Sequence, residues 1–125
     1  MIHTRICEIL GIEHPKRVQN RRQVNQAILD SDDHDTVLTE IPDITASQVW
    51  SGAMSRVKRN RFVERWSGRE WLLRQNLSEA AGSVRAARKN GDTDEVPLFY
   101  GQDAGLISDL PPAATIIERL VEIAF

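Results

Sequence analysis

The spacing of apolar residues predicts two helices near the start of the chain. The first covers residues 4–10, and its apolar positions fall on one helical face. Gly11 then supplies a residue that can take the left-handed conformation that ends many helices. The second helix is predicted to begin at Asn20, with Gln23 completing a capping box, and to end in the acidic turn of residues 30–35. The apolar stripe of the first helix is Ile6, Ile9 and Leu10, and that of the second is Val24, Ala27 and Ile28.

Two short extended segments are predicted next. Residues 36–39 are β-branched and flanked by turn formers, which favours a strand, and Pro42 limits its extension. Residues 43–55 are interpreted mainly as loop. The stretch 56–63 alternates imperfectly and fits either a partner strand or the start of a helix. We expect its first half to be extended, forming at most a two-stranded ribbon between 36–39 and 56–62.

The clearest periodicity predicts a long central helix. Ser67 and Glu70 form a capping box, and apolar residues recur between Leu73 and Ala87 at gaps of three and four. Asn90 and Gly91 supply a stop signal. A last helix is predicted from the first turn at Pro111 and Pro112. Its apolar stripe is Ile116, Ile117, Leu120, Val121 and Ala124. Together these elements predict a mainly helical α+β fold.

Composition limits the possible architectures and partners. The 125 residues are 41% hydrophobic, which fits one domain but is too short for a complete (β/α)₈ barrel of about 250 residues. The net charge of -2 predicts no overall attraction to nucleic acid or to anionic membranes. Cys7 is the single cysteine, so no internal disulfide can form. We find no signal peptide or membrane-spanning pattern and expect a cytoplasmic protein.

Few residues point to catalytic chemistry. His3, His14 and His34 lack the spacing of a metal site, so we predict no metal, and we assign no catalytic residue. Cys7 has no neighbouring base and is interpreted as a structural thiol. Gly101 and Gly105 bound a loop; read from the residues alone, this is a turn in which the glycines supply positive φ angles.

A basic cluster interleaved with aromatic residues lies between residues 56 and 71. It consists of Arg56, Lys58, Arg59, Arg61, Arg65 and Arg69, with Phe62, Trp66 and Trp71. A second, smaller cluster consists of Lys16, Arg17, Arg21 and Arg22. Such surfaces can bind phosphate or nucleic acid. Because Glu64, Glu70 and Glu79 lie nearby, nucleic-acid binding is the least favoured of the functions considered.

Two stretches resemble the nitronate monooxygenases, also called the 2-nitropropane dioxygenase family. TRICEILGIEHP, at residues 4–15, resembles the N-terminus of that family. From about Gln26 onward, five pieces resemble its C-terminal portion in the same order: DTVLT, RNRF, ER-W-GRE, Y-GQ-AGLI-D and PPAA-IIERLV. We therefore divide the chain into a remnant of the family N-terminus at 1–15, a junction at 16–25, and a C-terminal portion at 26–125.

The resemblance implies a fragment of an FMN-dependent TIM-barrel oxidoreductase that oxidises alkyl nitronates with molecular oxygen. In the family, most of the flavin-binding barrel lies between the two matching stretches, where this chain has only 16–25. We therefore expect the chain alone to be inactive and not to retain FMN. The resemblance implies that Gly101, Gln102 and Gly105 belong to the family's loop near the flavin.

An interaction module is the main alternative. Helices that evolved to lie against a barrel would expose apolar faces when that barrel is missing. Such faces favour a homo-oligomer or a protein partner. The sequence leaves open both this function and that of an inactive flavoenzyme relative.

Overall fold

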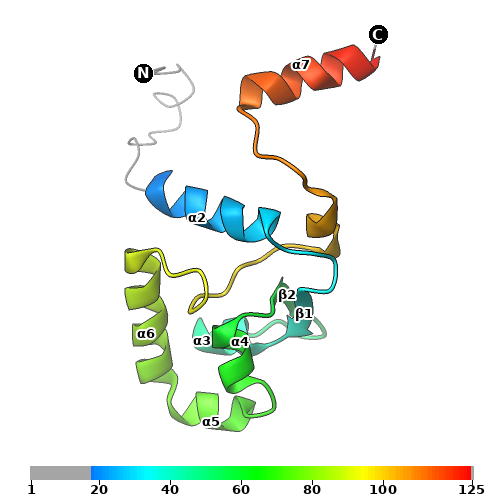
Figure 1. Cartoon of the computed structure of the whole chain (residues 1–125). Coiled ribbons are helices and arrows are strands. Elements are labelled where there is room, and N and C mark those ends of the chain that lie inside the picture. Colours follow the sequence, from blue (N-terminus) through cyan, green and yellow to red (C-terminus); the bar gives the residue numbers. More distant parts are fainter. Residues whose placement is uncertain (1–17, 125) are drawn as a thin grey trace, which may run out of the picture.

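The computed structural model describes residues 18–124, which form helices around a two-stranded sheet (Figure 1). The predicted helix over 4–10, the histidines His3 and His14, and Cys7 lie outside the described residues. In chain order, the elements are α2 (Val18–Leu29), β1 (Thr36–Thr39), α3 (Ile41–Thr45), β2 (Ser55–Lys58), α4 (Arg61–Trp66), α5 (Glu70–Gln75), α6 (Leu77–Asn90), the 3₁₀ helix η1 (Gln102–Leu106) and α7 (Ala113–Ala124).

The predicted ribbon is confirmed. β1 and β2 pair antiparallel, with Thr36 opposite Lys58 and Thr39 opposite Ser55. Helix α2 is also confirmed, and Ala27 from its predicted stripe is buried. The predicted start of α2 is wrong, because Asn20 already lies inside the helix and is not its cap.

The segment after β1 is not the predicted loop. It begins with α3, whose five residues are all buried and which carries a proline in its first turn. Proline suits that position because its missing N–H would have no partner inside the helix and its φ is already helical. Pro42 therefore ends the strand, as predicted, but also starts a helix.

The predicted long central helix is wrong, because residues 67–90 form two helices, α5 and α6, after a turn that closes α4. Ser67 does not begin a helix: its N–H donates to the carbonyl of Val63, so it closes α4. Gly68, with φ of 73°, then turns the chain. A second break falls at Asn76, between α5 and α6. The predicted stop is confirmed, because Gly91 ends α6 in the left-handed conformation with φ of 72°.

The core lies where the short elements meet. Its largest fully buried side chains are Ile41, Val57, Phe62 and Leu73, contributed by α3, β2, α4 and α5 in turn. Burying a side chain of this size contributes roughly 1.5–3 kcal/mol. Four elements too short to be stable alone are therefore held together by one shared cluster.

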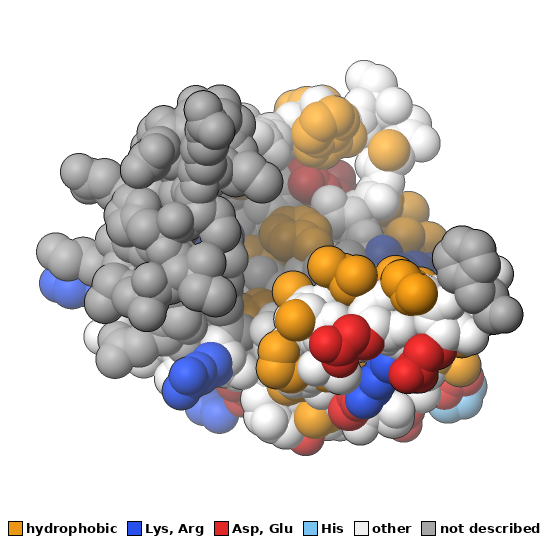
Figure 2. Space-filling view, turned by 90° about the horizontal axis from the view of Figure 1, so that it is seen from above, with side chains coloured by type: hydrophobic (Ala, Val, Ile, Leu, Met, Phe, Trp, Pro, Cys, Tyr) orange, Lys and Arg blue, Asp and Glu red, His pale blue; other side chains and the backbone are white. Residues whose placement is uncertain are grey.

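The last helix differs from the others. α7 begins at Ala113, directly after the two prolines, and none of its described residues is buried. In the view from above, hydrophobic side chains gather along one side of α7 and charged side chains along the other (Figure 2). The predicted apolar stripe therefore exists, but the described part of the chain leaves it in contact with solvent.

Candidate functional site

The loop that the resemblance places near a flavin forms η1 and lies against the end of α2. A Cβ atom added at Gly105 would lie 3.0 Å from the backbone nitrogen of Asp33, closer than most real Cβ contacts. Gly105 therefore allows two stretches of backbone to approach each other. The expected positive φ is wrong, because neither Gly101, with φ of -88°, nor Gly105 is among the glycines with positive φ.

A part-buried hydrogen bond joins Tyr100, just before this loop, to Ser31, just after α2. The Ser31 hydroxyl donates to the carbonyl of Ala27 at 2.6 Å, which uses its single hydrogen. The Tyr100 hydroxyl must then donate to Ser31 Oγ, at 2.7 Å. Burial is the main cause of the raised pKa of Tyr100. Tyr100 and Gly105 thus hold η1 against the end of α2.

The described residues at this loop do not fit the phosphate of FMN. A phosphate needs several free backbone N–H groups or cationic side chains. The Ala104 N–H already donates to the carbonyl of Gly101, and the Ile107 N–H donates to the carbonyl of Ala104. Asp32, Asp33 and Asp103 lie around the two glycines and would repel an anion. A role for Gly101, Gln102 and Gly105 at a flavin therefore stays a prediction from the resemblance.

Three open cavities lie on other parts of the described surface. The largest, about 540 Å³, lies between α4, α5 and α6, with Phe62, Trp66 and Leu72 in its wall. The other two, of about 370 and 330 Å³, flank the β1–α3 connection and share Glu40. None of the three is lined by η1, so this loop and the three cavities lie in different parts of the molecule.

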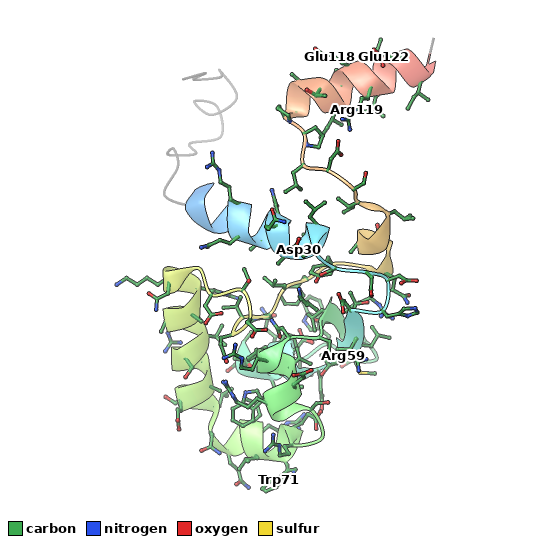
Figure 3. All side chains as sticks on the ribbon, in the orientation of Figure 1. Asp30, Arg59, Trp71, Glu118, Arg119 and Glu122 are labelled. Atoms are coloured by element: carbon green, nitrogen blue, oxygen red, sulfur yellow. The ribbon has the colours of Figure 1, made fainter. Side chains whose placement is uncertain are left out.

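Internal partners occupy much of the basic cluster. Arg61 contacts Asp94 at 2.7 Å, and Arg65 contacts Glu95 at 2.7 Å. The pKa of Arg61 is raised, chiefly by its hydrogen bond to Asp94 and by the charge of that residue. Arg59 lies near β2 and lines the 370 Å³ cavity together with acidic residues (Figure 3). The cluster is therefore a surface of mixed charge, which does not favour a phosphate backbone as its partner.

The described part of the chain contains no group of three or more His, Cys, Asp or Glu residues able to hold a metal ion. His34 is exposed and lies 3.6 Å from Asp33. This pair lies on the turn after α2, with no nucleophile assigned beside it. We therefore derive no catalytic step from the described residues.

Sequence reasoning missed the residue that organises the centre of the molecule. Asn60 is buried; its Oδ1 accepts a hydrogen bond from the Val63 N–H, which caps α4. Its Nδ2 donates to the carbonyls of Thr93 and Val96, which fixes the segment after α6. An asparagine just before a helix is a recognised cap signal, so the start of α4 was predictable from the local sequence.

Comparison with solved structures shows similarity to FabK from Thermotoga maritima. The TM-score is 0.57 and the sequence identity 27%; the match covers 81% of this chain and 30% of that chain. This chain thus spans less than a third of the length of FabK. The match supports a relationship to a TIM-barrel flavoenzyme without distinguishing which family. The described residues form no closed barrel, as the predicted fragment would require.

No protein-family model and no curated protein sequence matches the chain. Between residues 18 and 124, no helix has both the length and the hydropathy needed to cross a membrane.

Proposed function

We propose that this chain is a segment of an FMN-dependent oxidoreductase of the nitronate monooxygenase type, in which residues 26–125 supply the C-terminal portion. Alone, the chain neither holds flavin nor oxidises nitronates. The observation that carries the proposal is the match to FabK, which covers most of this chain but only 30% of that chain. The five sequence pieces add support, because their order is that of the nitronate monooxygenase family.

Within this proposal, the residues around η1 have separate roles. Gly105 and Tyr100 hold η1 against α2 through the close backbone approach and the hydrogen bond to Ser31. Gln102 is exposed, so its amide is free to contact groups supplied by the rest of a barrel. An amide side chain offers both donors and an acceptor, which suits the polar edge of a flavin. Bound FMN would supply the redox chemistry, and Gln102 would help to orient it.

A chimera tests the proposed kinship. Residues 26–125 replace the C-terminal portion of a complete nitronate monooxygenase, and the purified chimera is examined for FMN absorbance and for oxygen consumption with an alkyl nitronate. We expect FMN to be retained and nitronate to be oxidised. In the same chimera, Gln102→Ala should weaken FMN binding by about tenfold, the loss of one good polar contact. Gln48→Ala, on the exposed loop between α3 and β2, is the matched control.

A chimera that is folded and monodisperse but colourless and inactive would contradict the proposed kinship. Circular dichroism and sedimentation velocity establish folding and monodispersity, so that a misfolded chimera is recognised as such and redesigned at its junction.

A second candidate function is that of a self-associating or partner-binding helical module. Large exposed tryptophans favour it: Trp50 is 61% exposed and Trp71 is 60% exposed. Trp71 lies at the end of the molecule away from α7 (Figure 3). Tryptophan is enriched among the residues that dominate protein interfaces. A colourless protein that forms a defined oligomer in sedimentation velocity, and loses it on Trp71→Ala or Trp50→Ala, would support this function.

A further inference from the structure

Asp43 is a buried carboxylate that has no cationic partner in the described part of the chain. The residue is only 7% exposed. Both of its carboxylate oxygens share one donor, the Ser55 hydroxyl at 3.0 Å, and no described lysine, arginine or histidine forms an ion pair with it. The first turn of α3 favours a negative charge, but this helix has only five residues. Because a buried charge is costly unless it is paired, Asp43 calls for a counter-charge.

Asp43 lines the cavity of about 330 Å³ beside α3. The other charged residues of its wall, Glu40 and Arg74, pair with each other at 2.9 Å. Asp43 therefore gives this cavity one uncompensated negative charge. Most of the remaining wall is apolar, with one aromatic side chain: Ile44, Val49, Trp50, Ala53 and Leu77. A cavity of this volume lies at the lower end of those that hold small ligands.

The loop after α3 places Trp50 in the wall of this cavity. The Gln48 N–H donates to the backbone carbonyl of Asp43 at 2.8 Å, which folds the loop back onto α3. The Ala53 N–H then donates to the carbonyl of Trp50 at 3.2 Å and closes a turn that contains Gly52, with φ of 74°. The face of an indole ring attracts cations. A carboxylate and an indole thus line the same cavity, and both favour a positively charged ligand.

We propose that this cavity binds an alkylammonium group, which donates to the carboxylate of Asp43 and contacts Trp50. An ammonium offers three donors, and the two oxygens of Asp43 have acceptor sites that the single Ser55 hydrogen leaves unused. The apolar wall suits the alkyl chain. A metal ion fits less well, because the described residues include no group of three or more side chains able to hold one. The proposal depends neither on flavin nor on the proposed enzyme kinship.

Butylammonium chloride is the probe, and butanol is its neutral counterpart of similar size. Each is titrated into the full chain, and nuclear magnetic resonance follows the shifts of the backbone amide and indole N–H signals. We expect saturable binding of butylammonium with a Kd of about 1 mM, at least about tenfold tighter than that of butanol. Nα-acetyl-lysine methylamide presents the same group on a side chain. Whichever of the two cations binds more tightly shows whether the site takes a free amine or a lysine of another protein.

Variants of the Glu40–Arg74 pair test charge recognition without touching the core, because both side chains are about half exposed. Arg74→Gln leaves Glu40 unpaired beside the cavity and should tighten butylammonium binding about threefold, whereas Glu40→Gln should weaken it by a similar factor. Asp43→Asn should weaken binding at least about tenfold. Circular dichroism checks that this variant is folded; if it is not, the two variants of the exposed pair decide.

Two tryptophans provide a matched comparison. Trp50→Leu should weaken butylammonium binding about threefold. Trp71 is as exposed as Trp50 but does not line this cavity, so Trp71→Leu should leave the affinity unchanged.

Three results would overturn the proposal: no saturable binding of butylammonium, equal affinities for butylammonium and butanol, or an affinity that changes in neither Arg74→Gln nor Glu40→Gln. Asp43 would then serve only to hold Ser55 and the loop after α3.

Discussion

The side-chain amide of Asn60 donates a 2.7 Å hydrogen bond to the carbonyl oxygen of Val96, 36 residues further along the chain. A second bond from the same nitrogen reaches the carbonyl of Thr93 at 3.0 Å, and Asn60 Oδ1 accepts from the Val63 N–H at 3.2 Å. One buried side chain therefore caps α4 and fixes the segment that leads to η1.

Asn60→Ala should lower the free energy of unfolding by about 3 kcal/mol. Loss of the cap costs about 1 kcal/mol, and two carbonyls that lose their donor cost a further 1–3 kcal/mol. Asn60→Asp keeps an acceptor for the Val63 N–H but places a buried carboxylate against the carbonyl oxygens of Thr93 and Val96, so it should be at least as destabilising at neutral pH. Urea unfolding measures each change. Asn25→Ala, on the exposed side of α2, is the matched control and should change stability little; equal effects at both positions would contradict the assigned role of Asn60.

Asp94 should make the protein less stable in acid. Its carboxylate accepts a hydrogen bond from the Arg61 N–H at 3.2 Å and contacts the Arg61 guanidinium at 2.7 Å. The backbone bond is the main reason that the pKa of Asp94 is lowered. Because the folded pKa is lower than the unfolded one, the stabilisation is present above about pH 4 and is lost as pH falls through the folded pKa.

Asp94→Asn tests this contribution. The side chain of Asp94 is 46% exposed, so solvent screening keeps the effect below about 1 kcal/mol at neutral pH. The difference in unfolding free energy between wild type and variant should shrink between pH 5 and pH 2.5. Glu118→Gln, at an exposed carboxylate on α7, serves as the control. A difference that stays constant across that range would rule out the assigned ionic role.

Tyr100 should make the protein less stable in alkali. Burial raises the pKa of its hydroxyl above the ordinary value of 10.0, and the neutral form donates to Ser31. A raised folded pKa means that the stabilisation is fully present below pH 10 and is lost as pH rises through the folded pKa. Tyr100 is the only tyrosine, so ultraviolet absorbance follows its ionisation directly.

Tyr100→Phe should lower the free energy of unfolding by about 1 kcal/mol at neutral pH, because Ser31 keeps its bond to Ala27. Above pH 10, the difference in the free energy of unfolding between Tyr100→Phe and wild type should become smaller. If Tyr100 titrates at or below its ordinary pKa in the folded protein, the assigned bond and its burial are both in error.

The two glycines beside η1 should respond differently to substitution. Gly105→Ala places a methyl group 3.0 Å from the Asp33 backbone nitrogen, so one backbone must move, which costs about 1–3 kcal/mol. Gly101→Ala meets the end of the Asp103 side chain, which can rotate away, and should cost less. Thermal unfolding of the flavin-free chain measures both. Equal losses of thermal stability in Gly105→Ala and Gly101→Ala would argue against the packing role assigned to Gly105.

Elements whose patterns are purely local could be predicted from the sequence. The β-branched residues of β1 with their flanking turn formers, the stripe of α2 and the stop at Gly91 depend on neighbouring residues alone. The breaks around Ser67 and at Asn76 could not be predicted in this way. Ser67 followed by Glu70 matches a capping box, yet Ser67 is bound to α4 by its own N–H and is followed by a glycine at positive φ. The stretch from Ser67 to Glu70 therefore fits both the end of one helix and the start of the next.

The candidate site was predictable only in part, because its contacts join distant parts of the chain. The glycines at 101 and 105 were evident, but the reason for Gly105 is the backbone of Asp33. The partner of Tyr100 is likewise Ser31, 69 residues away. A sequence pattern identifies a glycine loop, but not what lies against it.

Titration of the purified full-length chain with FMN, followed by flavin fluorescence, tests the central claim most directly. The described residues at η1 offer too few free donors for the phosphate and three carboxylates that repel it, so the account predicts fluorescence equal to that of free flavin and no oxygen consumption with an alkyl nitronate. Saturable binding of one FMN per chain, with a Kd of about 1 µM or lower, would contradict it.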